Sequence, residues 1–298
     1  MKLLRLIELI RPKQWIKNFF VFAPLLFAGE LFHFGILIKS IYAFLAFCGA
    51  SSMVYIINDI SDIESDRYHK EKRFRPLASG DVTIAQARIF FVIILALTVL
   101  LCLKLNIGLA ISAGTYFIIN LLYSLKVKNI VLLDVFFISF GFMLRIIGGA
   151  AAISVPLSSW MILTAIFISL FLAISKRRAE LSQSDIQNLG KQRKVLLEYD
   201  ITFTDQMNTV AATGTIICYA LYTVSEKAII TFRTENLIYT TPFVIYGIFR
   251  YMYLLHKKNL GESPSQVVTK DIPLIINIFL WLVISIIIIY KPALPISF

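Results

Sequence analysis

The sequence contains a series of apolar stretches of about 20 residues, the length that crosses a bilayer as a helix. Apolar types make up 58% of the 298 residues and charged types only 16%, whereas soluble domains carry about 25% charged residues. The sequence therefore predicts an all-α, polytopic membrane protein with a single transmembrane helical domain over 1–298. About nine transmembrane helices are expected, at 16–33, 35–57, 83–103, 106–124, 130–152, 158–175, 207–225, 236–256 and 272–290.

Basic residues are distributed unequally between the two sides of these predicted spans. One side carries 23 Lys and Arg and the other carries 5, and such an excess marks the cytoplasmic side of a membrane protein. We therefore expect the N-terminus and the long loops 58–82 and 176–206 in the cytoplasm, the C-terminus outside, and the chain in the inner (plasma) membrane. The net charge of +11 has the same origin and does not indicate a nucleic-acid partner.

An acidic segment follows the second predicted span. Asp59, Asp62 and Asp66 are spaced i, i+3 and i+7, which places three carboxylates on one face of a helix, with Asn58 beside them. Such oxygen ligands suit Mg²⁺, with Mn²⁺ as a substitute, and Mg²⁺ is commonly shared with substrate phosphates. The following bases, Lys72, Arg73 and Arg75, can hold phosphate oxygens. The helix is expected to end at Arg75, because Pro76 follows; the alternative is a solvated loop whose bases only set the topology.

Further polar residues lie at the predicted cytoplasmic ends of other spans. Lys176 and Arg177 are spaced for ion pairs with Glu180, so this group is either a phosphate site or a pair of surface ion pairs. Arg145 lies midway along the fifth span, where an Arg indicates function or a pairing with another buried polar group. The remaining candidates for substrate binding or interfacial anchoring are Lys17, Tyr123, Lys126 and Lys128.

The acidic segment resembles the first Asp-rich motif, NDxxDxxxD, of the UbiA superfamily of intramembrane prenyltransferases. RPKQWIKN at 11–18, DRYHKEKRFRPLASG at 66–80, YSLKVKNIVLLD at 123–134, SFGFMLRIIGGAAAISVPLSSW at 139–160, SKRRAEL at 175–181 and GESP at 261–264 are similar to one branch, the decaprenyl-phosphate phosphoribosyltransferases. One departure agrees with that branch: the second DxxxD motif of typical prenyltransferases is replaced by SKRRAEL, with Glu180 as its one acid. The resemblance covers essentially the whole chain.

The resemblance implies a UbiA-type helix bundle and a Mg²⁺-dependent reaction in the membrane. Phosphoribosyl pyrophosphate would donate 5-phosphoribose to a polyprenyl phosphate, with Mg²⁺ on Asp59, Asp62 and Asp66 binding the pyrophosphate. Two alternatives remain open. A prenyltransferase with an aromatic acceptor lacks its second metal motif here, and a transporter explains neither the carboxylates nor the long loops.

Overall fold

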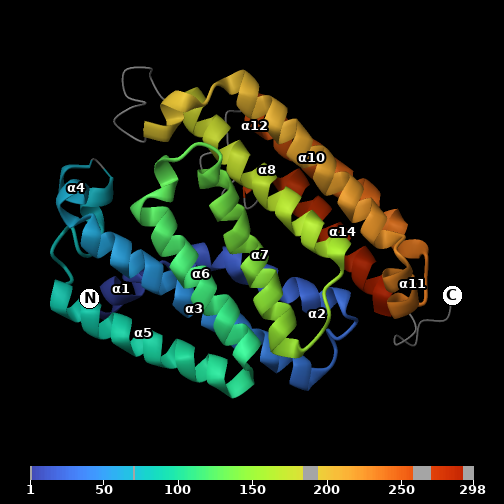
Figure 1. Cartoon of the computed structure of the whole chain (residues 1–298), viewed down its shortest axis with the longest axis horizontal. Coiled ribbons are helices and arrows are strands. Elements are labelled where there is room, and N and C mark those ends of the chain that lie inside the picture. The colour runs from blue at the N-terminus through green and yellow to red at the C-terminus, as the bar shows by residue number, and fades with distance from the viewer. Residues whose placement is uncertain (1, 70, 184–193, 258–269, 291–298) are drawn as a thin grey trace. The chain divides into compact units, whose positions relative to one another are not determined.

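The structure is a computed structural model that describes residues 2–69, 71–183, 194–257 and 270–290. Across these residues every regular element is a helix (Figure 1), which confirms the all-α prediction. The first half of the chain contains α1 (Lys2–Leu9), η1 (Pro12–Phe22), α2 (Ala23–Phe27), α3 (Phe34–Ser61), α4 (Ile63–Tyr68), η2 (Lys72–Phe74), α5 (Ile84–Leu105), α6 (Ile107–Leu125) and η3 (Val127–Asn129). The second half contains α7 (Leu133–Ile153), α8 (Ser159–Gln183), η4 (Lys194–Glu198), α10 (Ile201–Thr223), α11 (Glu226–Phe232), η5 (Asn236–Thr240), α12 (Thr241–Lys257) and α14 (Ile272–Tyr290).

Six of the described helices are long and apolar enough to cross a membrane, and a seventh crossing is possible if α10 and α11, bent by 51°, form one span. The six are α3, α5, α6, α7, α8 and α14. These helices establish a multi-pass membrane protein, but they do not confirm the predicted count of nine.

Two of the nine predicted spans are not single α-helices. The 16–33 stretch is divided between the 3₁₀ helix η1 and the five-residue α2, and Gly29 then adopts a φ of +75°. The 236–256 stretch is divided between η5 and α12. At 17 residues, α12 is about 26 Å long, shorter than the roughly 30 Å hydrocarbon core.

Two compact units, interleaved along the sequence, make up the chain. Unit 1 comprises Met1–Leu25, Phe32–Leu125 and Leu144–Val155, and unit 2 comprises Leu26–Leu31, Lys126–Met143 and Pro156–Phe298. The helix α7 begins in unit 2 and ends in unit 1. Each unit has its own apolar core.

In unit 1, α3 packs against α5, α6 and η1, and its pairing with α5 is visible in Figure 1. Small residues allow this close packing. A Cβ added to Gly49 of α3 would lie 2.1 Å from Thr98 Oγ1 of α5, and one added to Gly149 of α7 would lie 2.1 Å from the Val21 carbonyl oxygen. The first contact places α3, which ends in the acidic segment, against α5, and the second places α7 against η1.

In unit 2, α8 packs along α10, and α12 contacts both α10 and α14. The approach of α8 and α10 depends on Gly214, since a Cβ there would lie 2.5 Å from the Phe167 ring. Phe171 and Leu254 are buried in the core of this unit. The end of α8 that is predicted to face the cytoplasm therefore belongs to a helix that packs against α10. The helix α8 continues to Gln183, eight residues beyond the end of the predicted 158–175 span.

Candidate active site

The acidic segment does not form one continuous helix. The helix α3 ends at Ser61, Asp62 adopts φ −98° and ψ 5°, and α4 begins at Ile63. Backbone hydrogen bonds continue across the break, from Asp62 N to Asn58 O (2.9 Å) and from Asp66 N to Asp62 O (2.8 Å). The predicted helix end at Arg75 is wrong, because α4 ends at Tyr68 and η2 follows it.

Two of the three carboxylates, those of Asp59 and Asp66, share one partner, Arg75. Arg75 Nη1 donates to Asp59 Oδ1 at 3.1 Å and to Asp66 Oδ2 at 2.6 Å. Arg11 Nη2 donates to the same Asp59 oxygen, and the Arg11 guanidinium lies 4.8 Å from the centre of the Tyr55 ring. Both carboxylates are buried, with 3% exposure for Asp59 and 2% for Asp66. Buried carboxylates require such cationic partners, because an unpaired buried charge is very costly.

The backbone of Arg75 is anchored by the residues that follow it. Arg75 has the extended conformation expected before proline (φ −62°, ψ 145°). Leu77 and Ala78 are buried, and Leu77 belongs to an apolar cluster with Leu9 and Ile56. The Val82 N–H donates to the Pro76 carbonyl at 2.9 Å. The loop that carries Arg75 is therefore held against α1 and α3, while the Arg75 side chain remains 26% exposed.

The other predicted residues of this segment are more accessible. Asn58 and Asp62 are half-buried, whereas Lys72 and Arg73 are exposed on η2, where the Arg73 guanidinium lies 4.8 Å from the Phe74 ring centre. In the described part of the chain, no three acidic, His or Cys side chains converge as a metal site. The three aspartates are chemically suitable ligands for a hard divalent cation, but two of them are bound to Arg75.

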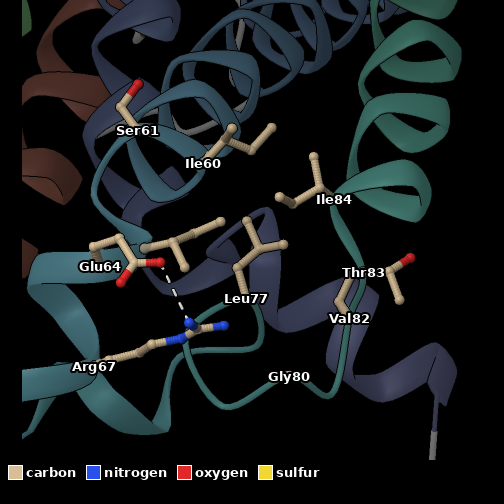
Figure 2. A pocket seen from close by; sticks show the side chains of 10 residues that line it. Ile60, Ser61, Glu64, Arg67, Leu77, Gly80, Val82, Thr83 and Ile84 are labelled. Carbon is tan, nitrogen blue, oxygen red and sulfur yellow. Dashed lines mark hydrogen bonds and ion pairs between the residues drawn. The ribbon is translucent and has the colours of Figure 1, made fainter.

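A pocket of about 400 Å³ lies beside this segment, between α4, the loop around Leu77 and the start of α5. Figure 2 shows its apolar side chains together with the Glu64–Arg67 ion pair of α4. None of the three aspartates lines this pocket. Asp66 therefore contacts Arg75 in the buried cluster, whereas its neighbour Arg67 lines the pocket.

Arg145 is the centre of a second polar network within unit 1. Its exposure is only 5%, and its guanidinium donates to Asn18 Oδ1 at 2.7 Å and to the Tyr116 hydroxyl at 2.9 Å. The Asn18 side-chain amide in turn donates to Ser51 Oγ at 3.3 Å. Arg145 is thus paired with buried polar groups, the alternative that the sequence left open beside a functional role. The network ties η1, α3, α6 and α7 together.

Unit 2 has a buried network of its own around Arg177. This side chain is 0% exposed and donates to Asp134 Oδ2 at 2.5 Å and to Glu180 Oε2 at 2.6 Å. The Tyr199 hydroxyl donates to Asp134 Oδ1 at 2.7 Å and accepts from the Leu132 N–H at 2.9 Å. The Arg177–Glu180 pair is therefore not the surface ion pair that the sequence left open, and Arg177 has no exposed face for a phosphate.

Burial, followed by the hydrogen bond to the Asp134 carboxylate, raises the pKa of the Tyr199 phenol above its ordinary value. The phenol therefore remains a donor at neutral pH. Its second bond supports Leu132, which has a φ of +66°, an unfavourable conformation for a leucine. Tyr199 thereby fixes the turn that leads from Lys126 and Lys128 into α7.

The remaining predicted substrate-binding residues are distributed over both units. Lys17 in η1 and Tyr123 in α6 are half-buried in unit 1, whereas Lys126, exposed, and Lys128, half-buried, belong to unit 2. Lys176 in α8 lies 3.9 Å from Glu180 and is 35% exposed. Its neighbour Arg178 is mostly buried and donates to Asp205 Oδ1 at 2.8 Å.

Several partners of the site residues were not identified from the sequence. Arg11, Asn18 and Tyr116 contact predicted residues from 48, 127 and 29 positions away along the chain. Tyr199 contacts Asp134, the partner of Arg177, from 65 positions away. No spacing rule links residues so far apart. The one available signal was the resemblance of the 11–18 segment, which contains Arg11 and Asn18.

Comparisons with known proteins identify the family. The UbiA prenyltransferase family model matches residues 19–283. The chain is 34% identical over 288 residues to a decaprenyl-phosphate phosphoribosyltransferase of Mycolicibacterium smegmatis, covering 93% of this chain and 90% of that protein. It is 38% identical over 221 residues to the protein of the same name from Corynebacterium glutamicum, covering 73% of this chain and 66% of that protein.

The fold agrees with this assignment. The structure of a UbiA homolog from Archaeoglobus fulgidus, bound to GPP and Mg²⁺, superimposes with a TM-score of 0.69 at 18% identity, covering 96% of this chain and 99% of that one. The family match extends over most of the sequence and includes the Asp59–Asp66 segment. The chain therefore belongs to the UbiA prenyltransferase family.

Proposed function

We propose that this protein transfers 5-phosphoribose from phosphoribosyl pyrophosphate to a polyprenyl phosphate and releases pyrophosphate. The observation that carries the proposal is the similarity to a decaprenyl-phosphate phosphoribosyltransferase along 93% of the chain. The Asp59–Asp66 cluster lies within that similarity and supplies the chemistry that a diphosphate donor needs. The absence of a second acidic motif around Glu180 also favours this reaction over prenyl transfer from a prenyl diphosphate.

The donor set of the acidic segment suits Mg²⁺, which Mn²⁺ can replace. Asp59, Asp62 and Asp66, with Asn58 beside them, offer hard oxygen ligands at the end of α3. A related structure contains Mg²⁺, which supports a divalent-metal requirement here. When bound, the ion would neutralise the charge that develops on the leaving pyrophosphate.

The chain's own residues contribute binding and orientation. The bond from ribose C1 to the pyrophosphate oxygen breaks, and a bond from C1 to an oxygen of the lipid phosphate forms. The attacking oxygen is already anionic, so the reaction needs no general base, and positioning and electrostatics dominate. We assign pyrophosphate contacts to Lys72, Arg73 and Arg75. The candidate contacts for the remaining phosphates are Lys17, Tyr123, Lys126, Lys128 and Lys176.

The two buried arginines have a different proposed role. Arg145 and Arg177 are enclosed by protein partners, so they position the helices and turns that carry the accessible cations. Glu180 contributes to the same role through its contacts with Arg177 and Lys176. The unequal distribution of basic residues supports an inner-membrane location with the acidic segment and the N-terminus on the cytoplasmic side.

The direct test incubates membranes containing the protein with phosphoribosyl pyrophosphate labelled in the ribose and with polyprenyl phosphate. Label should enter the lipid fraction in the presence of Mg²⁺, and a variant with Asp66→Ala should give background counts. A parallel reaction supplies a prenyl diphosphate and an aromatic acid. If the parallel reaction proceeds and label never enters the lipid, the proposed function is wrong and general prenyl transfer replaces it.

A further inference from the structure

Arg75 occupies the position between the two buried carboxylates of the acidic segment. A single nitrogen, Nη1, donates to both Asp59 and Asp66, and each carboxylate is almost completely buried. The side chain of Arg75 therefore supplies, in this arrangement, the positive charge that two neighbouring carboxylates require. Arg11 contributes a second positive charge, at Asp59.

The same carboxylates are the ones that, under the proposed function, hold a divalent metal. A metal ion and a guanidinium that contact the same carboxylates repel each other strongly in a poorly solvated site. We propose that Arg75 is an exchangeable cation, which leaves Asp59 and Asp66 when metal and diphosphate arrive together and then binds an oxygen of the diphosphate. This inference rests on the proposed function and adds an order of events to it.

The local structure allows the side chain to move while the backbone remains in place. Pro76, Leu77 and Ala78 are buried directly after Arg75, and the bond from Val82 N to Pro76 O closes the loop. The Arg75 side chain is nevertheless 26% exposed and reaches the carboxylates from the loop side. Arg is also suited to both partners, since its planar group donates to carboxylates and phosphates alike.

The charges of the cluster explain why the two ligands should arrive together. Three aspartates and the two arginines Arg11 and Arg75 give the cluster a single net negative charge. A divalent ion alone would reverse that charge while Arg75 still competes with it for the carboxylates. A diphosphate, which carries several negative charges, offers both the metal and Arg75 a new partner, so the exchange is favoured only when both ligands are present.

The test measures metal and diphosphate binding separately, in the full-length protein purified in detergent. Mn²⁺ binding is followed by the loss of the free-ion signal in electron paramagnetic resonance, and inorganic pyrophosphate binding by calorimetry at saturating Mn²⁺. The variants are Arg75→Gln and Arg75→Lys. The second keeps the positive charge but lacks the planar guanidinium group with its several N–H donors. The matched control is Arg67→Gln, because Arg67 pairs with exposed Glu64 outside the cluster.

We expect opposite effects on the two ligands. Without pyrophosphate, Arg75→Gln should bind Mn²⁺ at least tenfold more tightly than the unchanged protein, and Arg75→Lys should show a smaller gain. With Mn²⁺ saturating, pyrophosphate should bind Arg75→Gln at least tenfold more weakly. The Arg67→Gln control should remain within about twofold for both ligands, because its charge is exposed and screened.

Either missing effect overturns the exchange. If both Arg75 variants bind Mn²⁺ no more tightly than the unchanged protein, Arg75 does not compete with the metal. If pyrophosphate binding is unaffected, the released side chain does not take up the diphosphate. A different result would affect the proposed function itself: if neither the unchanged protein nor Arg75→Gln holds Mn²⁺ even with pyrophosphate present, the metal site is wrong.

Discussion

Replacing Asp134 by alanine should destabilise unit 2 severely, because the fully buried Arg177 then loses the Asp134 carboxylate and keeps only that of Glu180. The substitution removes the bond from Arg177 Nε (2.5 Å) and the bond from the Tyr199 hydroxyl (2.7 Å). Breaking a buried ion pair by removing one partner costs about 3–5 kcal/mol. Glu180 keeps its contact with Arg177, so we expect the lower part of that range, about 3 kcal/mol.

A double variant separates the cost of the unpaired charge from the loss of packing. Combining Asp134→Ala with Arg177→Met removes the buried guanidinium, so the double variant should recover about 2 kcal/mol relative to Asp134→Ala alone. The assay is reversible unfolding of the detergent-solubilised protein. The control, Glu64→Ala, removes an exposed ion pair and should change stability by no more than about 0.5 kcal/mol. If the double variant is no more stable than Asp134→Ala, the uncompensated charge is not the cause.

Three further predictions test the site, the topology and the pH dependence. Asp59→Ala, Asp62→Ala and Asp66→Ala should each abolish turnover in folded protein, and a chelator should do the same; unchanged activity in two of the three would remove the metal site. In a variant without the three buried cysteines, a cysteine at Ser65 should resist a membrane-impermeant thiol reagent in intact cells, and one at Glu235 should react. The reverse labelling pattern would invert the topology. A cysteine at Ser184, in the other long loop, should also resist the reagent, although this position lies outside the described residues. The pKa of Tyr199 is raised in the folded state. Its contribution to stability should therefore be present below about pH 10, the ordinary pKa of a tyrosine, and should decline as the pH rises through the higher pKa of the folded state. Tyr199→Phe should weaken stability by about 1–2 kcal/mol at neutral pH and should lose less stability at alkaline pH than the unchanged protein. An identical alkaline profile in the variant would contradict this.

The helices that the sequence predicted best are α5, α6 and α14, whose bounds lie close to those of three predicted spans. The α14 helix covers 272–290, as expected, and α5 and α6 each begin and end within two residues of the prediction. Apolar composition alone predicts these three helices, because a bilayer requires every backbone polar group to form its hydrogen bonds within the helix. The 16–33 and 236–256 stretches depart from this rule. Pro24 and Gly29 interrupt the first, and the second starts with the 3₁₀ helix η5, so that its α-helix begins only at Thr241.

The acidic segment shows where reasoning from spacing along the chain fails. The i, i+3, i+7 pattern correctly selected Asp59 and Asp66 as neighbours, but it assumed an unbroken helix through Asp62. The partners of Asp59 at the end of α3 are also distant along the chain: Arg75 lies 16 residues after it and Arg11 lies 48 residues before it. A buried carboxylate is stable only beside such partners, and no local pattern indicates which distant arginine will provide the charge.

The membrane-crossing helices and the segment that carries the carboxylates can both be predicted from the residues alone. Apolar length and residue spacing control those properties, and both can be read from neighbouring residues. Which cations are accessible and which are enclosed depends instead on how the helices pack. Arg177 and Lys176 are adjacent in the sequence, yet Arg177 is completely buried against Asp134, 43 residues away, while Lys176 is 35% exposed. Adjacent residues on a helix point in directions about 100° apart, so the packing of α8 in unit 2 buries one side chain and leaves the next accessible.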